Sequence, residues 1–401
     1  MKKIRTINNL LPLLFVILLL MIYVDCVHAD DSEGVRINIG YNQKMSQSKV
    51  DDLIDQYNGK MVLGIPSINM KTYIVSKKYL AIIKSILLKD NTIDFVEEDV
   101  RMSIPAPPLG ASKMPTDPFY PVQWGPLCIG AEEAWNYGSL YDHPDIIVAV
   151  IDTGVDLDHP DLVNMVDTDI DYDFVNNDST AMDDNGHGTH CAGIIAAQMD
   201  NGQGVAGLQN VTIMAVKGLD SGGSGWTSVL AQCITYAVDN GAKVLSNSWS
   251  GTIPSSTLKN AVNYAFSKGV VVVAAAGNSG NSIKNYPAAY PAVIGVAALG
   301  TCTTRAGYSN YGTENVFISA PGSSIYSTYL DDSYASLSGT SMACPHVAGV
   351  AAMWIGVYAD YIALIPIQVM YLLAAHADDL GNLGKDIYFG WGRVDMFPWA
   401  D

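Results

Sequence analysis

Three short segments carry side chains that could cooperate in an attack on a carbonyl group. Ser341 lies in the small-residue segment 338–346, directly before an Ala/Val-rich helix. At a helix start, free N–H groups and the positive end of the dipole stabilise a developing negative charge. A capping serine would suit the same position. A nucleophilic serine also needs a base, and the base needs an orienting acid.

One histidine and one aspartate occupy settings that suit those two roles. Residues 146–151 are a continuous apolar run that ends in Asp152, which predicts a buried parallel strand with a carboxylate at its C-terminal end. Open α/β sheets place their sites at that edge. His187 falls in the first turn of a predicted helix, 187–197. The order along the chain is Asp, His, Ser.

Residues 152–154, 187–190 and 339–343 resemble the three signature blocks of the subtilisin-like serine proteases (subtilases), which share this order. The similarity extends from about residue 117 to residue 394 and is greatest to the thermitase branch. The resemblance implies acyl transfer. Ser341 would attack the peptide carbonyl, His187 would act as general base, and Asp152 would hold the imidazole in place.

The resemblance also implies an oxyanion hole and a substrate cleft. Asn278, which follows the predicted strand 270–276, would bind the oxyanion together with the Ser341 N–H. A peptide would add as a strand between two flanking segments. The predicted cleft residues are Ser224, Gly225, Trp226, Ser248, Trp249, Ser250, Ala275, Ala276 and Gly277. None is acidic, so we expect cleavage after apolar or aromatic residues, although Ser250, where many relatives have glycine, would narrow the pocket.

Structural Ca²⁺ is the cofactor that the resemblance implies, since this ion takes carboxylate, amide and carbonyl oxygens. A first predicted site consists of Asp117, Asp161 and Asn201, with further oxygens from Gln198, Gln203 and Val205. A second, thermitase-type site would use Asp173, Asp178 and Thr180. Asn176 and Met182 depart from the family pattern there, so a solvated acidic loop is the alternative.

The composition describes a globular protein with few cationic groups. The chain has 401 residues, is 49% hydrophobic and carries a formal net charge of -18. No Lys or Arg occurs between Lys113 and Lys217, which argues against a nucleic-acid partner. After Cys26 there are five cysteines, so internal pairing leaves at least one free thiol: Cys128, Cys191, Cys233, Cys302 and Cys344. We expect Cys191 and Cys344 to be small buried residues beside the catalytic face.

The chain divides into four predicted parts. Residues 1–29 have a basic start, a short apolar run and a small residue before Asp30, as in a secretory signal peptide, with an uncleaved anchor as the alternative. Residues 30–103 show a βαββαβ pattern, which resembles the ferredoxin-like, inhibitor-type propeptide of subtilases. The Pro-rich composition of residues 104–116 predicts a linker with a processing site. Residues 117–401 are the predicted catalytic domain.

Within the catalytic domain, apolar strands alternate with Ala-rich helices. Strands are predicted at 146–152, 211–216, 243–248, 270–276, 293–298 and 316–320, and helices at 187–197, 236–240, 258–268 and 347–354. This alternation predicts an α/β fold, a mostly parallel sheet with helices on both faces. A small α+β domain precedes it.

Together these features predict a secreted, calcium-stabilised subtilase that cleaves proteins or peptides. We expect a monomer that is made as a zymogen, with its own propeptide as intramolecular inhibitor. Two alternatives remain open at this point. One is a catalytically silent subtilase fold that serves as a binding protein, and the other is a membrane-anchored processing protease of narrow specificity.

Overall fold

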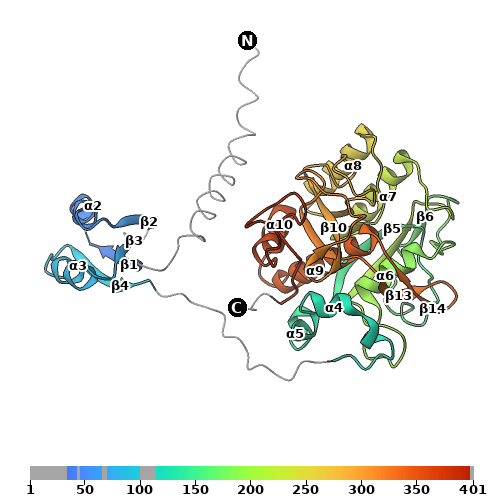
Figure 1. Cartoon of the computed structure of the whole chain (residues 1–401), viewed down its shortest axis with the longest axis horizontal. Helices are drawn as coiled ribbons and strands as arrows, with labels where there is room; N and C mark the ends of the chain where they lie inside the picture. Colours follow the sequence, from blue (N-terminus) through green and yellow to red (C-terminus); the bar gives the residue numbers. More distant parts are fainter. Residues whose placement is uncertain (1–33, 43–45, 66–69, 100–113, 398–401) are drawn as a thin grey trace, which may run out of the picture. The chain divides into compact units, whose positions relative to one another are not determined.

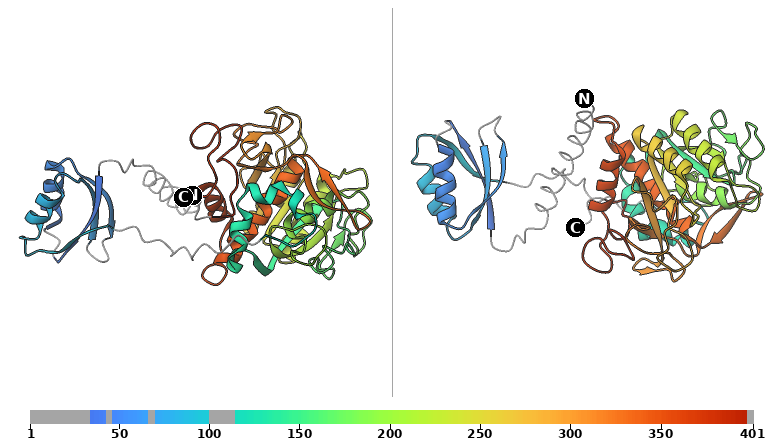
Figure 2. Two further views of the ribbon diagram at one scale, coloured as in Figure 1. Left: turned by 60° about the horizontal axis from the view of Figure 1, so that its bottom comes forward. Right: turned by 90° about the horizontal axis from the view of Figure 1, so that it is seen from above.

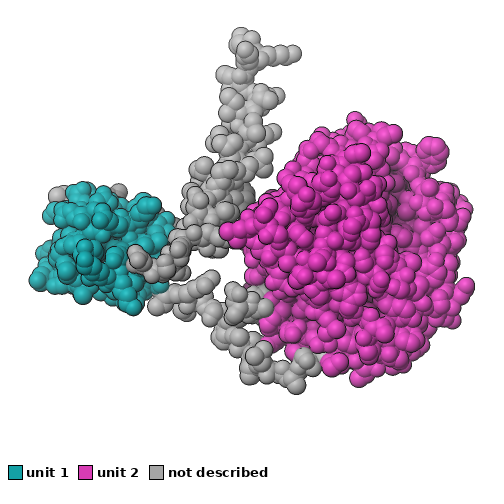
Figure 3. All heavy atoms as spheres, in the orientation of Figure 1, with its two compact units in different colours: residues 1–106 teal, residues 107–401 magenta. Residues whose placement is uncertain are grey.

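The computed structural model describes residues 34–42, 46–65, 70–99 and 114–397 (Figure 1). The chain forms two compact units, Met1–Ala106 and Pro107–Asp401 (Figure 3). The predicted signal peptide, 1–29, and most of the predicted linker, 104–116, lie outside the described residues. Their roles, and the processing bond, stay predictions.

The first unit has the βαββαβ order that its sequence pattern predicts. Its four strands form an antiparallel sheet in the order β2-β3-β1-β4, and both helices lie on one face of that sheet (Figure 2). Alternate apolar residues of β1, such as Ile37 and Ile39, are fully buried with Ile83 of α3. The elements are β1 (Gly34–Tyr41), α2 (Ser46–Gln56), β2 (Lys60–Ile65), β3 (Met70–Ser76), α3 (Leu80–Leu87) and β4 (Ile93–Glu98).

The second unit is built on a sheet with the order β11-β10-β9-β8-β5-β7-β6, in which β12 also pairs with β10. Every pairing in this sheet is parallel except β10 with β11. The strands are β5 (Asp142–Asp152), β6 (Tyr172–Asp173), β7 (Asn210–Lys217), β8 (Val244–Asn247), β9 (Val271–Ala275), β10 (Val293–Thr301), β11 (Thr304–Arg305) and β12 (Ile318–Pro321). The α/β prediction is confirmed.

Helices cover both faces of this sheet, and each face has its own apolar core (Figures 1 and 2). Val148 and Val150 of β5 pack with α6 (His187–Ala196) and α9 (Thr340–Tyr358). Ala149 and Ile151, which alternate with them, pack with α7 (Thr227–Asp239) and α8 (Ser256–Ser267). Because β5 is buried on both faces, it reads as an uninterrupted apolar run.

Two helices begin earlier than the sequence pattern predicts. The predicted helix 236–240 is the end of α7, whose buried residues Leu230, Cys233, Ile234 and Ala237 follow helical spacing from the first turn onward. The predicted helix 347–354 is the centre of α9, which already begins at Thr340. An 18-residue window of α9 is apolar enough to cross a membrane, but 83% of that window is buried inside the unit, so α9 is a core helix.

Several short elements were not predicted. They are the helices α4 (Trp124–Cys128), α5 (Ala131–Trp135) and α10 (Pro366–Ala375), the 3-10 turns η2 (Tyr120–Val122) and η3 (Gly138–Leu140), the two-residue strands β6 and β11, and the hairpin of β13 (Ile325–Tyr329) with β14 (Ser333–Leu337). The hairpin contacts α6 through side chains: Thr328 Oγ1 donates to Thr189 O at 2.7 Å, and Ser327 Oγ donates to His190 O at 2.9 Å. It therefore braces the helix that carries His187.

Candidate active site

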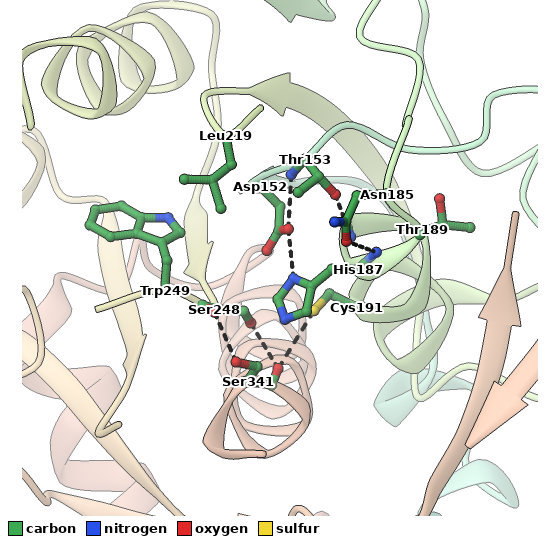
Figure 4. Close-up of polar contacts among 12 residues, drawn as sticks. Asp152, Thr153, Asn185, His187, Thr189, Cys191, Leu219, Ser248, Trp249 and Ser341 are labelled. Atoms are coloured by element: carbon green, nitrogen blue, oxygen red, sulfur yellow. Dashed lines mark hydrogen bonds and ion pairs between the residues drawn. The ribbon is translucent and has the colours of Figure 1, made fainter. Parts of the chain in front are cut away.

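Asp152 is the last residue of β5 and is completely buried. Its Oδ1 accepts a hydrogen bond from Thr153 N at 2.8 Å and lies 2.7 Å from His187 Nδ1 (Figure 4). Its backbone oxygen accepts from the N–H groups of Gly218 and Leu219 at 2.9 and 3.0 Å. The carboxylate is thus held at the C-terminal edge of the parallel sheet, where the strand pattern predicts it.

His187 is the first residue of α6. Burial lowers the pKa of this imidazole, but the charge and hydrogen bond of Asp152, with a further contribution from the charge of Asp183, outweigh burial and raise the pKa above its usual value. An imidazole in this setting is a better base than a free one. The Nδ1 that faces Asp152 leaves Nε2 as the nitrogen available to a nucleophile.

Asp183 organises the loop before His187, and the sequence analysis missed it. Its Oδ1 accepts from the N–H groups of Asn185 and Gly186, both at 3.0 Å. Its Oδ2 accepts from Thr189 N at 2.9 Å and from Thr189 Oγ1 at 2.6 Å. The N-cap position of α6 is Gly186, which has no side chain, so the Asp183 carboxylate accepts the N–H of Thr189 in the first turn instead.

Ser341 lies in the first turn of α9, and the ring of His187 lies between Asp152 and Ser341 with Nε2 on the side of the serine (Figure 4). The hydroxyl of Ser341 donates to Ser248 O at 2.9 Å. Attack on a substrate would therefore need the hydroxyl proton to leave Ser248 O and face His187. The structure brings all three predicted triad residues together.

A proline within α9 frees the carbonyl of the serine. The N–H that would pair with Ser341 O in a regular helix belongs to residue 345, and Pro345 has none. Ser248 Oγ donates to this oxygen at 2.8 Å, and Cys191 Sγ approaches it at 3.5 Å. Cys191 of α6 and Ser248, which follows β8, therefore complete the first turn of the helix that carries Ser341.

The two predicted oxyanion donors lie on either side of Gly339, which has no side chain. Asn278 is exposed, and its Oδ1 accepts from Thr340 N at 2.8 Å and from Thr340 Oγ1 at 2.9 Å. A Cβ added to Gly339 would lie 3.3 Å from Asn278 Nδ2 and 3.5 Å from Ser341 N. The nitrogens of both predicted donors therefore lie within 3.5 Å of the position that a side chain of residue 339 would occupy.

The other predicted cleft residues follow the ends of neighbouring parallel strands or precede α7. Ala275, Ala276, Gly277 and Ser248 are buried, whereas Ser250 is exposed. Trp249 Nε1 donates to Ile151 O at 2.9 Å, which fixes the indole beside β5. Ser224, Gly225 and Trp226 form an exposed segment, and 80% of Trp226 is accessible.

The structure pairs Cys128 with Cys302 in a disulfide and leaves Cys191, Cys233 and Cys344 as free, buried thiols. Burial raises the pKa of the Cys191 thiol and raises that of Cys344 to about 11. Both thiols are therefore protonated near neutral pH. This supports their interpretation as small core residues beside the site.

The residues of the first predicted calcium site come together in the second unit. Asp117 and Asp161 are 2% and 0% exposed, and within the described residues neither forms an ion pair. Asp161 Oδ1 accepts from Asn201 Nδ2 at 2.7 Å, and its Oδ2 accepts from Val205 N at 2.9 Å. Asp117 accepts from the N–H groups of Asp200 and Asn201. Two buried carboxylates beside one oxygen-rich loop fit a hard cation.

The remaining predicted ligands border the same loop. Gln203 N donates to Asn201 Oδ1 at 2.7 Å, which folds the loop back on itself. Gln198 N donates to the backbone oxygen of Asp161 at 2.9 Å, and its side-chain oxygen accepts from Asn164 at 2.9 Å. Binding of an ion through the side chain of Gln198 would have to displace Asn164.

The second predicted site is more exposed than the first, since Asp173 is buried but Asp178 and Thr180 are exposed. Asp173 Oδ1 accepts from the N–H groups of Val175 and Asn176 at 2.7 and 2.8 Å, and its Oδ2 accepts from Asn176 Nδ2 at 2.8 Å. Asp178 Oδ1 accepts from Thr180 N at 2.9 Å. Hydrogen bonds within the loop therefore already satisfy these carboxylates, as in an ordinary Asx turn.

A buried aspartate paired with a histidine, next to a serine at a helix start and on the C-terminal edge of a parallel sheet, is the arrangement of a subtilisin-like serine endopeptidase. The model of the Subtilase family matches residues 143–392 of this chain. The chain belongs to the subtilase family, peptidase S8, and its substrates are proteins.

Known relatives agree with this assignment. Thermitase of Thermoactinomyces vulgaris is 51% identical over 241 residues, which are 60% of this chain and 84% of thermitase. Subtilisin DY of Bacillus licheniformis is 41% identical over 280 residues, which are 69% of this chain and 97% of that protein. The crystal structure of a cold-adapted subtilisin-like serine proteinase matches with a TM-score of 0.56 at 34% identity, over 65% of this chain and 91% of that one.

Proposed function

We propose that this chain is a secreted, calcium-stabilised serine endopeptidase that matures by self-processing and hydrolyses peptide bonds through Asp152, His187 and Ser341. The observation that carries the proposal is the 2.7 Å contact between His187 Nδ1 and the buried Asp152 carboxylate. The position of the His187 ring next to Ser341 supports the same conclusion (Figure 4). The conservative substitution of any one of these residues should remove the activity.

In the proposed reaction, the Ser341 hydroxyl turns toward His187 Nε2 and attacks the substrate carbonyl carbon while the imidazole takes its proton. Asp152 stabilises the imidazolium that forms. The tetrahedral oxyanion binds between Asn278 Nδ2 and Ser341 N, beside Gly339. His187 then gives the proton to the leaving amine. A water molecule, activated by the same imidazole, releases the acyl group from Ser341.

Substrate would bind as an added strand between the segments 224–226 and 248–250. The small residues Ala275, Ala276 and Gly277 would form one wall of the primary pocket, with Ser250 at its rim. The absence of an acidic side chain among these predicted pocket residues favours cleavage after apolar or aromatic residues. The exposed Trp226 supports an apolar subsite farther along the peptide.

Calcium would bind at Asp117, Asp161 and the loop 198–205. Burial of two carboxylates without a cationic partner costs free energy, and a bound cation would offset this cost. When bound, the ion would supply charge compensation and cross-link the start of the unit to this loop, a purely structural role. We expect the Asp173 loop to be a weaker site or none, since Asp178 and Thr180 are exposed and an ion there would replace little lost hydration.

The first unit would serve as propeptide and intramolecular inhibitor, and residues 1–29 would direct secretion. The ferredoxin-like fold of residues 34–99 supports the first assignment. The test expresses the wild-type chain and Ser341→Ala from Asp30 onward with calcium. Intact mass and N-terminal sequence are then followed over time.

The expected result is that wild type releases a fragment that ends between Met102 and Thr116, whereas Ser341→Ala stays whole. If both chains fold and stay whole, self-processing is wrong. Fluorophosphonate labelling of Ser341 would then separate a protease that another enzyme activates from a silent binding protein. If both chains are cut alike, the cut belongs to the expression host and self-processing is again unsupported.

A further inference from the structure

Lys217, the last residue of β7, is a buried cation beside the catalytic strand. It is 1% exposed and pairs in register with Asp152 across the β5–β7 ladder. It is also the first Lys or Arg after Lys113. A buried ammonium is costly unless hydrogen bonds and charges compensate for its lost hydration, so its contacts have to account for its position.

The ammonium contacts three oxygens, one for each of its three N–H donors. Lys217 Nζ lies 2.5 Å from Thr153 O, 2.6 Å from Asp184 Oδ1 and 3.2 Å from Leu219 O. The Asp184 carboxylate is about half exposed, with 49% of its side chain accessible. Neither the mechanism nor the predicted cleft uses any of these three contacts.

Each contact joins Lys217 to a segment that holds part of the catalytic pair. Thr153 directly follows Asp152 and donates its own N–H to the Asp152 carboxylate. Asp184 lies three residues before His187, in the loop that Asp183 caps. Leu219 donates its N–H to the backbone oxygen of Asp152. One side chain therefore ties the aspartate loop to the histidine loop.

We infer that Lys217 is a positioning residue of the active site, which holds Asp152 and His187 at hydrogen-bond distance through Thr153 and Asp184. It does not touch substrate. The inference rests on the proposed function, because it concerns the geometry of the same Asp–His pair. Displacement of a catalytic group by about 1 Å can lower a rate by about 10²-fold, so a clamp between the two loops affects kcat.

The test has two independent readouts. The first is the steady-state kinetics of the mature enzyme on a peptide anilide. The second is the far-downfield proton resonance of the His187–Asp152 hydrogen bond, recorded in a Ser341→Ala background, where the chain cannot digest itself. Lys217→Met removes the ammonium and keeps the apolar stem. Lys268→Met, at the exposed end of α8, is the matched control.

For Lys217→Met we expect kcat to fall by about tenfold to a hundredfold with KM within about twofold, and the resonance to broaden or disappear. Asp184→Ala should lower kcat by only about twofold to fivefold. It removes one of the three contacts of Lys217, and this contact is with a half-exposed carboxylate, which contributes little. Lys268→Met should change neither readout. If Lys217→Met does not fold, Asp184→Ala decides the question.

A lower melting temperature with unchanged kcat and an unchanged resonance would mean that Lys217 only stabilises the fold, and would overturn the inference. If Lys217→Met does not fold, an Asp184→Ala variant with unchanged kcat and an unchanged resonance would overturn the inference in the same way. Failure of the proposed function gives a different result, since the wild-type protein would then not hydrolyse the peptide anilide. The resonance of its Asp–His pair, and the effect of Lys217→Met on it, could still be measured.

Discussion

Ser248 and Ser341 are joined by two hydrogen bonds of opposite direction. Ser341 Oγ donates to Ser248 O at 2.9 Å, and Ser248 Oγ donates to Ser341 O at 2.8 Å. The second bond replaces the helical bond that Pro345 cannot make. Ser248, the residue after β8, thus supports the backbone of Ser341 and accepts a hydrogen bond from its hydroxyl.

The pH dependence of activity should report the pKa of His187. Burial lowers this pKa, but Asp152 and Asp183 raise it above the usual value of about 6.5. A general base must be neutral, so kcat/KM should decline as the pH falls through the raised pKa. We therefore expect the acid limb of the kcat/KM profile to have its midpoint above about 6.5.

Asp152→Asn should move that midpoint to lower pH, since it removes the charge that raises the pKa. It should also lower kcat by about 10⁴-fold, the size known for this substitution in another serine protease. A midpoint that stays in place would contradict the assignment of Asp152. Measurements between about pH 5 and pH 9 cover the titration range of a histidine.

Asn278→Ala should lower kcat and leave KM nearly unchanged, because the oxyanion exists only in the transition state. Loss of one such donor costs about 10²–10³ in kcat in a related subtilisin. Steady-state kinetics on a peptide anilide would measure the effect. A kcat within about threefold of wild type would show that Asn278 does not bind the oxyanion.

Gly339→Ala tests the space between the two oxyanion donors. The φ of Gly339 is 166°, which is extended backbone, so strain is not the concern. The added methyl would lie 3.3 Å from Asn278 Nδ2 and crowd the oxyanion. We expect kcat to fall by about tenfold or more, with little change in melting temperature.

The matched control is Gly307→Ala. Gly307 is exposed, and a Cβ there would meet nothing within 4 Å. This variant should keep wild-type kinetics. If Gly339→Ala also kept them, the oxyanion would have to bind elsewhere.

Removal of calcium should lower the melting temperature of Ser341→Ala, an inactive form that avoids self-digestion. A ligand at about 100 times its Kd stabilises a folded protein by about 2.7 kcal/mol. Asp161→Asn should abolish most of this calcium dependence, since Asp161 is a fully buried predicted ligand. Thermal unfolding followed by circular dichroism, with calcium or with a chelator, measures this change in melting temperature.

Asp178→Asn serves as the companion variant for the second predicted site. Asp178 Oδ1 accepts from Thr180 N within its own loop. We expect the melting temperature of Asp178→Asn, made in the Ser341→Ala background, to depend on calcium as much as that of Ser341→Ala alone. A clear loss of calcium dependence in Asp178→Asn would show instead that the Asp173 loop also holds an ion. If Asp161→Asn kept the full calcium dependence of the melting temperature, the first site would be refuted.

Thiol titration should confirm the cysteine pairing. Of the cysteines after Cys26, the chain should show three free thiols when denatured without reductant, Cys191, Cys233 and Cys344, and five after reduction. Exchange of both Cys128 and Cys302 for serine should lower the free energy of unfolding by about 2–5 kcal/mol. Five free thiols before reduction would contradict the disulfide.

Periodicity and signature spacing predicted the elements that carry the triad. The apolar run before Asp152 predicted a buried parallel strand, and it is part of β5. The small-residue segment around Ser341 predicted a helix start. The predicted helix 347–354 covers only the centre of α9. The helix can contain Pro345 because Ser248 replaces the hydrogen bond that this proline cannot make.

By itself the sequence determined the α/β class, the order of the predicted triad residues and the oxygen-rich residues of the proposed calcium site, because these depend on local spacing and residue type. Only the tertiary structure decided that Cys128 pairs with Cys302, that Ser248 holds Ser341 and that Lys217 joins the loops of Asp152 and His187. These contacts join residues far apart along the chain. They form only after strands and helices have packed, so no local pattern records them.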